Sequence, residues 1–267
     1  MREFAAIYVQ QFRTTFASFV QYRASMLIWM IWHILEPLVY LVVWSAVAAA
    51  GAGTVQGFGA RDFSAYFIVL MVVNHMTYTW IFYEYEYRVR HGSLSSALLR
   101  PLHPIHADVI DNVSSKLITL PMMLLAAGIL GAFFRPAIHT TGLSLLLFLP
   151  ALVLAFSLRF ILEWTLALAA FWTTRVSAVN QAYYVAALFL SGQMAPLALF
   201  PPAVRTAAAV LPFRWMLGFP VELFLGRVTA AEACRGIAVQ AVWLGVALLL
   251  MRFAWRAGVR RYSAVGA

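Results

Sequence analysis

The sequence predicts an all-α, polytopic membrane protein with six transmembrane helices. Of its 267 residues, 63% are hydrophobic and 11% are charged, and the mean hydropathy is +0.83. A soluble domain carries roughly 25% charged residues. Long apolar runs alternate with short segments that contain arginine, proline or glycine. This alternation predicts repeated bilayer crossings, because a helix needs about 20 apolar residues to span the hydrocarbon.

The chain divides into an N-terminal helix and one transmembrane domain. Residues 1–22 place apolar side chains on one helical face, which predicts an interfacial amphipathic helix. Residues 23–267 then form the six-span domain. The spans are expected at residues 24–50, 63–82, 108–134, 142–172, 176–193 and 237–255, with a tight turn at residues 173–175 between the fourth and the fifth.

The arginine distribution orients this topology. Eleven arginines fall in segments that the six spans place inside the cell, and six fall outside. The positive-inside rule therefore predicts that both termini are cytoplasmic. The formal charge of +9 would suggest nucleic-acid binding in a soluble protein, but here the basic residues flank apolar runs. We expect a lipid bilayer as partner and no nucleic acid.

Residues 83–102, between the second and third spans, combine charge with a short amphipathic stretch. Ser93 is a plausible N-cap, and Pro101 ends the helix after about two turns. So short a helix needs a supporting surface, which favours a docking helix at about residues 93–102. A solvated loop whose arginines obey the positive-inside rule explains the same spacing equally well. The residues assigned to docking are Arg88, Arg90, Gly92, Ser93, Leu94, Leu98, Arg100 and Pro101.

Charged residues also occur inside the expected spans, namely Glu36, Lys116, Arg159 and Glu163. Each costs at least about 2.5 kcal/mol if it faces lipid, so they are expected to face one another or a polar cavity. Arg159 and Glu163 lie four residues apart on one helix face. We favour an ion-pair lock that fixes the packing of the spans over a polar element of a substrate path. Residues at similar depth that could line the same interior are His33, Asn74 and His75.

Residues 194–226 are apolar but repeatedly interrupted by proline. The interruptions that we assign to an outer hairpin are Pro196, Pro201, Pro202 and Pro212. Proline in a helix interior removes a backbone hydrogen bond, so a straight span is disfavoured. We expect two short helices that enter the outer leaflet and turn back, before the last span.

No recognisable catalytic motif is present. The chain has no glycine-rich phosphate loop, no zinc-protease motif and no nucleophile elbow. Its single cysteine excludes a multi-cysteine metal site, and three histidines near residues 91–106 lack carboxylate or cysteine partners at metal-ligand spacing. We therefore expect no bound cofactor or metal and no enzymatic activity of the chain itself.

Two motifs resemble one membrane protein family. Residues 87–94 (YRVRHGSL) with 98–102 (LLRPL), and residues 159–164 (RFILEW) leading to 171–173 (FWT), are similar to type-2 ABC exporter permeases, also called the ABC-2 type. Within that family they resemble the subfamily formerly catalogued as a domain of unknown function. The order of expected elements is also similar over nearly the whole chain.

The resemblance implies a function and partners. The short helix at 93–102 would be a coupling helix seated in a groove of a separate ABC ATPase subunit, present in two copies, which binds the ATP and Mg. A second permease, identical or related, would complete a path lined by the first, second and fifth spans. The location implied is the bacterial cytoplasmic (inner) membrane.

Three functions are compatible with these residues. The first is the permease subunit of an ATP-driven exporter for a hydrophobic or amphipathic compound. The second is a self-sufficient proton-coupled secondary transporter or channel, with Glu36, His75 and Glu163 as a proton relay. The third, an intramembrane enzyme acting on lipids, needs a nucleophile or metal that the sequence does not show.

Overall fold

The computed structural model describes residues 2–51, 53–173 and 176–262. Within these residues the chain is helical except for short connections and one small hairpin, which confirms the predicted helical fold class. The turn expected at residues 173–175 falls almost entirely outside the described residues.

The helices differ greatly in length. The long ones are α1 (Arg2–Gln21), α2 (Arg23–Ala50), α3 (Ala60–Thr77), α6 (Ile105–Phe134), α7 (Gly142–Ala167) and α12 (Ala230–Arg261). The short ones are α4 (Ile81–Arg90), α5 (Leu94–Leu98), α8 (Val176–Leu190), α9 (Pro202–Val210), α10 (Phe213–Met216) and α11 (Gly218–Phe224). Two 3-10 turns, η1 (Leu168–Phe171) and η2 (Leu197–Leu199), complete the helical elements of the described residues.

Five segments of the described chain are long and apolar enough to cross a membrane. They are Leu27–Ala50, Ala60–Arg90, Ile105–Phe134, Gly142–Phe171 and Ala230–Arg261. The second is longer than the predicted 63–82, because the charged residues that follow continue as α4. The expected fifth span corresponds to α8, whose 15 residues extend only about 22 Å at 1.5 Å per residue. That is less than the roughly 30 Å of hydrocarbon, so a sixth crossing stays a prediction.

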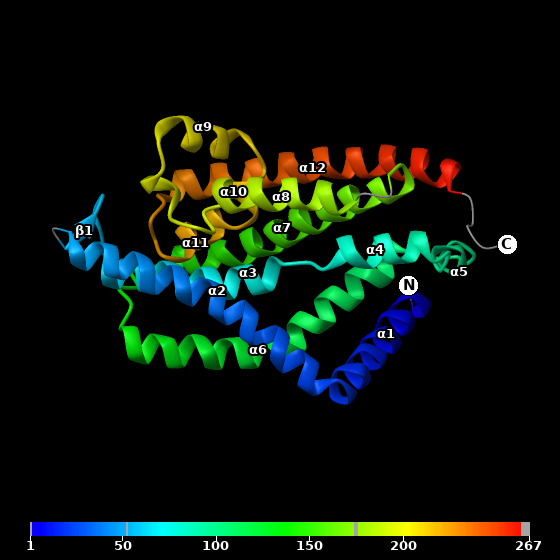
Figure 1. Cartoon of the computed structure of the whole chain (residues 1–267), viewed down its shortest axis with the longest axis horizontal. Helices are drawn as coiled ribbons and strands as arrows, with labels where there is room; N and C mark the ends of the chain where they lie inside the picture. The colour runs from blue at the N-terminus through cyan, green and yellow to red at the C-terminus, as the bar shows by residue number, and fades with distance from the viewer. Residues whose placement is uncertain (1, 52, 174–175, 263–267) are drawn as a thin grey trace.

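The long helices form two groups around α3 (Figure 1). On one side α7 packs along α12, and on the other α2 and α6 contact α3. α1 packs against α6 and lies apart from the α7–α12 pair (Figure 1). α6, which contains Pro121, bends sharply in its course.

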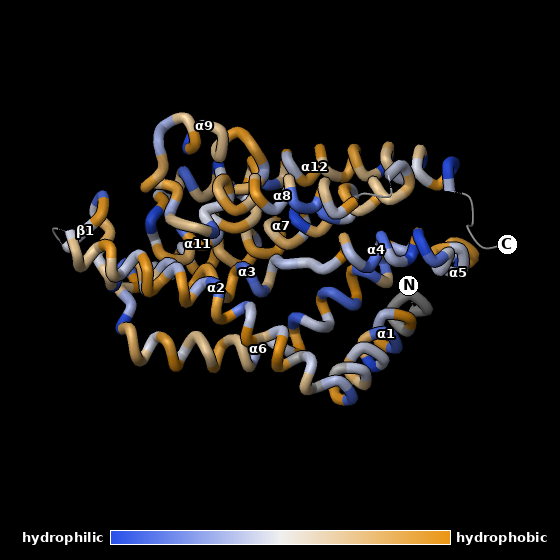
Figure 2. The backbone as a smooth tube through the Cα atoms, viewed as in Figure 1, coloured by the Kyte–Doolittle hydropathy of each residue, from blue (hydrophilic) through white to orange (hydrophobic). Residues whose placement is uncertain are grey.

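α3 is the central helix of this arrangement. In the candidate span Ala60–Arg90, which contains α3, 78% of the apolar window is buried, against 11–28% in the other four candidate spans. Many apolar side chains of the outer helices are therefore exposed, among them Ile28, Leu125 and Val242. Figure 2 shows hydrophobic residues along α2, α6 and α12. Such exposed apolar surface is expected of helices that face lipid or another membrane subunit.

The connection between α2 and α3 departs from the all-α expectation. It contains a hairpin of two-residue strands, β1 (Thr54–Val55) and β2 (Phe58–Gly59), which pair antiparallel. The residues between them, Gln56 and Gly57, both have positive φ. This conformation forms the tight turn that matches strand twist.

The proline-rich segment before α12 differs from the predicted pair of helices. It contains η2 followed by three short helices, α9, α10 and α11. Each predicted proline lies at a helix start: Pro196 precedes η2, Pro201 and Pro202 begin α9, and Pro212 precedes α10. Because proline is tolerated at the first helical turn, these residues punctuate several short helices where we had expected two.

Candidate functional site

The tip formed by α4 and α5 is the first candidate site. α4 ends at Arg90 because Gly92 has φ +69°, the left-handed conformation that commonly terminates a helix. The expected helix at 93–102 is shorter in the structure, covering only Leu94–Leu98. Ser93 occupies the predicted N-cap position of α5, but its side chain makes no capping bond, and its hydroxyl donates to the Arg88 carbonyl at 3.5 Å.

The base of this tip is firmly anchored to two long helices. Arg88 Nη1 donates to Asp108 Oδ1 of α6 at 2.7 Å, and Trp164 Nε1 of α7 donates to Asp108 Oδ2 at 3.0 Å. Tyr85 packs edge-on against Trp164 and is buried, and so is Leu94. α4 and the start of α5 therefore move only together with α6 and α7.

The far end of the tip is open to solvent. Leu99 is 88% exposed, the largest exposure of any large apolar side chain among the described residues. Arg100 and Pro101, which follow it, are also exposed, whereas Leu98 is half-buried. Arg90 pairs with Glu86 at 3.3 Å. An anchored helix end that exposes an arginine beside a large apolar side chain is suited to bind another protein, because arginine is enriched among the residues that dominate binding energy at interfaces.

A second connection joins α5 to the last helix. The Ser95 and Tyr262 hydroxyls lie 3.1 Å apart, so the end of α12 touches the tip. Between α1 and α5 lies a cavity of about 430 Å³, lined among others by Gln11, Ser96 and Arg100. Four of the eight predicted docking residues, Arg88, Ser93, Arg100 and Pro101, thus line a cavity beside the tip.

The second candidate site is the break between α3 and α4. Residues 78–80 are not helical, although they lie inside the candidate span Ala60–Arg90. Some backbone groups at this break therefore have no partner within the helix. Lys116 of α6 donates its Nζ to the Tyr78 carbonyl at 2.5 Å, and the Thr79 hydroxyl donates to Glu163 of α7. Lys116 therefore satisfies a carbonyl of this broken backbone, as irregular membrane segments require, and Glu163 holds the Thr79 side chain beside it.

Arg159 and Glu163 form the predicted ion pair. Arg159 Nε lies 2.8 Å from Glu163 Oε1, and both side chains are largely buried. Glu163 also accepts a hydrogen bond from the Tyr183 hydroxyl at 3.1 Å. Arg159 Nη1 donates to Asn74 Oδ1 at 2.8 Å and to the Thr77 hydroxyl at 3.2 Å. The pair therefore fastens the end of α3 to α7 and to α8.

Glu36 does not join this cluster. Its carboxylate accepts hydrogen bonds from Gln193 Nε2 at 2.8 Å and from the Tyr184 hydroxyl at 3.3 Å, so it links α2 to the C-terminal end of α8 and the residues just beyond. Lys116 has no carboxylate within salt-bridge distance among the described residues and contacts the Phe156 ring instead. Glu36 thus lies beside α8, whereas Lys116, Arg159 and Glu163 lie around the break between α3 and α4.

The three residues predicted to line one polar interior do not lie together. His33 and His75 lie with ring centroids 5.9 Å apart, and His75 Nε2 is 2.9 Å from the Thr119 hydroxyl. Together with Lys116 they line a cavity of about 320 Å³ between α2, α3 and α6. Asn74 instead bonds Arg159 on the other side of α3.

Sequence reasoning missed the residues that join these charges. Asp108, Thr79 and Tyr183 each bond one of the predicted charged side chains. Asp108 could have been found as an acid that opens the span directly after a basic segment. Thr79 and Tyr183 give no such signal, because hydroxyl side chains are common in membrane helices.

Comparison with known proteins identifies the family. A family model described as "ABC-2 family transporter protein" matches residues 30–266, which is most of the chain. No curated protein and no solved structure matches the chain. The match confirms the resemblance carried by the two sequence motifs, and the apolar helices agree with a multi-pass membrane protein. The chain therefore belongs to the ABC-2 transporter family and is a permease of that type.

Proposed function

We propose that this chain is the permease subunit of an ATP-driven exporter, and that α5 docks on a separate ABC ATPase. Membership of the ABC-2 family supports a membrane transport component that works with such an ATPase. In this proposal the ATPase subunits, present in two copies, carry the ATP and Mg. The cargo is a hydrophobic or amphipathic compound, moved out of the cytoplasm of a bacterial cell.

The observation that carries the proposal is the contrast within the α4–α5 tip. Leu94 is fully buried and Leu99 is 88% exposed, five residues further on. A helix of five residues has no stability of its own, so its position depends on the buried anchor. The anchor thereby holds the exposed end in a fixed position, where a partner protein binds it.

The contacts of the tip suggest how motion is transmitted. When two nucleotide-binding subunits close, their grooves move and displace α5. Asp108 binds Arg88 of α4 and Trp164 of α7, so α6 and α7 follow the displacement. The break at residues 78–80 lets α4 change its angle to α3 while Lys116 and Glu163 keep the freed polar groups bonded.

A second permease protomer, identical or related, completes the proposed path. α2 supports this part of the proposal, since its apolar side chains remain widely exposed in the single chain. Ile28 is 68% and Trp32 64% exposed, and only 17% of the apolar window of α2 is buried. We place α5 and both termini on the cytoplasmic side, in agreement with the arginine distribution.

The arrangement of Glu163 favours the exporter over a proton-coupled transporter. A relay carboxylate must exchange protons, whereas Glu163 is paired with Arg159 and accepts bonds from two hydroxyls. His75 and Glu36 bond other partners, and no hydrogen bond joins any two of the three proposed relay residues within the part of the chain that the structure describes. We therefore propose an ion-pair lock for Arg159 and Glu163.

The docking role is tested by charge substitution at the exposed end. Leu99→Glu should weaken co-purification of the ATPase, because burial of a leucine contributes about 1.5–3 kcal/mol, or roughly 10- to 150-fold in affinity. Val210→Glu is the matched control, since Val210 is 66% exposed at the end of α9, outside the tip. Equal ATPase recovery with both variants would contradict the docking role.

Coupling is tested by two further variants. Gly92→Pro cannot adopt φ +69°, and Arg100→Glu reverses an exposed charge at the tip. Both should separate ATP hydrolysis from transport while the spans stay folded. Unchanged substrate-stimulated ATPase activity and export in both variants would refute the coupling role.

A further inference from the structure

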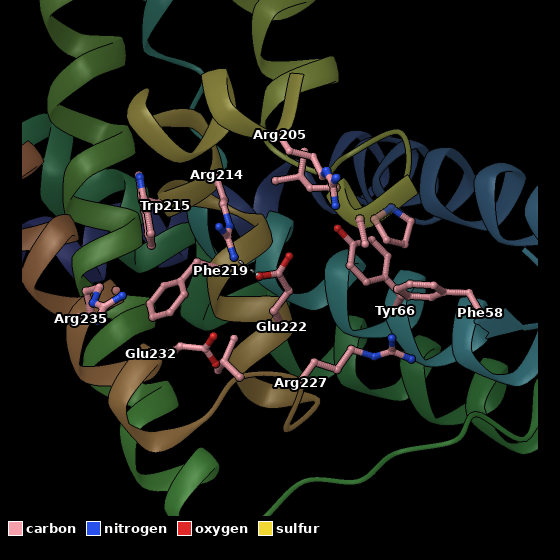
Figure 3. Close-up of a pocket in the computed structure, with 15 residues that line it drawn as sticks. Phe58, Tyr66, Arg205, Arg214, Trp215, Phe219, Glu222, Arg227, Glu232 and Arg235 are labelled. Atoms are coloured by element: carbon pink, nitrogen blue, oxygen red, sulfur yellow. Dashed lines mark hydrogen bonds and ion pairs between the residues drawn. The ribbon is translucent and has the colours of Figure 1, made fainter. Parts of the chain in front are cut away.

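A second large cavity lies at the end of the bundle that carries α9, α10 and α11. Its volume is about 480 Å³, within the roughly 300–1,000 Å³ of small-molecule sites. α9, α10, α12 and the residues that follow α11 all contribute to its wall. Figure 3 shows the labelled arginine and aromatic side chains arranged around it.

The charge of this cavity is unbalanced. Four arginines line it, Arg205, Arg214, Arg227 and Arg235, against two glutamates, Glu222 and Glu232. Glu222 is paired with Arg214 at 2.8 Å, and Glu232 accepts hydrogen bonds from the Thr229 backbone and hydroxyl at the start of α12. Arg205 and Arg235 have no carboxylate within salt-bridge distance among the described residues. The cavity therefore keeps a surplus of positive charge.

Two of the guanidinium groups lie over aromatic rings. The Arg227 guanidinium lies 4.2 Å from the centroid of the Phe58 ring and pairs with Asp62 at 2.6 Å. The Arg214 guanidinium lies 5.2 Å from the Trp215 ring. Stacking of this kind orients a guanidinium while its N–H edge stays available for an oxyanion.

One buried donor in the cavity lacks a partner. Arg214 Nε is buried and makes no hydrogen bond, although Nη2 of the same side chain bonds Glu222. A buried donor without an acceptor is unfavourable, and native structures leave few of them. Because Nε is itself shielded from solvent, an oxyanion in the open cavity meets the exposed guanidinium groups of Arg205 and Arg235 instead.

The remaining wall of the cavity is apolar. Phe219 and Trp215 form one side, and Gly236 lies so close to Phe219 that a Cβ atom there would be 2.2 Å from the ring. The cavity thus combines basic groups with an aromatic surface. This combination fits a ligand that has an anionic oxygen-rich group attached to an apolar body.

From these observations we propose that the cavity is a binding site for a phosphate group. Arginine suits phosphate better than a simple charge would, because its planar fork donates two parallel hydrogen bonds to the oxygens. The phosphate can belong to a lipid headgroup or to a free phosphorylated solute. The site lies within one protomer and needs neither ATP nor the docking role of α5, so it can be tested independently of them.

Binding is measured on the full chain in an uncharged detergent by native mass spectrometry. The probe is dioctanoyl phosphatidylglycerol, and dioctanoylglycerol, which lacks the phosphate, is the comparison. We expect the phosphate-bearing probe to bind about tenfold or more tightly, as expected for a charge-assisted hydrogen bond. Rising ionic strength should weaken its binding, because the arginines involved are partly exposed.

The matched variants are two pairs of arginine substitutions. Arg205→Gln with Arg235→Gln removes two cavity guanidiniums that hold no described ion pair. Arg252→Gln with Arg256→Gln makes the same charge change at the opposite end of α12, at exposed positions. We expect the cavity pair to lose about tenfold or more in affinity and the control pair to stay within about twofold.

Inorganic phosphate added as a competitor distinguishes the two sources. Displacement of the lipid probe would support a site for free phosphate compounds, and resistance to displacement would support a lipid headgroup. Equal binding of the phosphate-free lipid would overturn the proposal. So would equal loss of affinity in the cavity pair and the control pair, or no loss in either.

Discussion

Replacing Glu163 by alanine tests whether the buried ion pair on α7 locks the packing of the spans. The substitution removes the partner of Arg159, whose side chain is only 12% exposed, and the acceptor of two hydroxyl groups. Breaking a buried pair by removing one partner destabilises a protein by about 3–5 kcal/mol, since the remaining charge is uncompensated. We expect a loss of that size in the free energy of unfolding.

A double substitution separates the charge effect from lost packing. Arg159→Met with Glu163→Leu removes both charges, and replacement of a whole buried pair by apolar residues is often close to neutral. Asn74 and Thr77 would lose the Arg159 donor, which adds a loss of about 1–2 kcal/mol. The double variant should therefore be more stable than Glu163→Ala alone.

The assay is equilibrium unfolding of the full chain in mixed micelles, followed by far-ultraviolet circular dichroism as the denaturing detergent increases. Glu84→Ala is the control, because Glu84 pairs with Arg88 at an exposed position, where ion pairs contribute about 0–1 kcal/mol. A loss below about 1 kcal/mol for Glu163→Ala, or a double variant at least as unstable, would refute the lock.

Three further predictions use the same unfolding assay or transport. Gly236→Ala should destabilise the chain, since the new Cβ would lie 2.2 Å from Phe219. Gly245→Ala is the control: nothing lies within 4 Å of its new Cβ, so it should be neutral or stabilise the chain by about 1 kcal/mol through helix propensity. Equal effects of the two variants would contradict the close packing of α12 on α11. Gln240→Leu removes two hydrogen bonds to backbone carbonyls of α7 and α10 and should cost about 1–3 kcal/mol, and wild-type stability would count against those bonds. Lys116→Met should leave the Tyr78 carbonyl at the α3–α4 break without its donor, and it should reduce transport more than ATPase binding. Full transport activity of this variant would disprove the prediction.

Composition and periodicity predicted the parts of the fold that follow from hydrophobicity. The long apolar runs became the five candidate spans, and the i,i+4 spacing of Arg159 and Glu163 became an ion pair. These features depend on local sequence, so a single chain reveals them. The length of α5 was overestimated because Leu99 and Arg100 have helix-forming character but no surface to pack against.

Other features depend on which helices meet in space. Lys116 and Glu36 were expected to face the other charged residues of the spans or a polar cavity, but α6 brings the first to the break after α3, while α2 brings the second to α8. The break itself carries no proline or glycine, and the residues that bond it, Lys116 to the Tyr78 carbonyl and Glu163 to the Thr79 hydroxyl, come from other helices. The arginine cavity was missed because its residues were counted only as topology signals.

The most direct measurement of the central claim is a cross-link from the tip of α5. The chain has one cysteine, Cys234, so Leu99→Cys in a Cys234→Ser background gives a single thiol at the exposed position. A photoactivatable reagent on this thiol in native membranes should attach to an ABC ATPase, while the same reagent on Val210→Cys should not. Labelling of no ATPase from Leu99, or equal labelling from both positions, would contradict a docking role for α5.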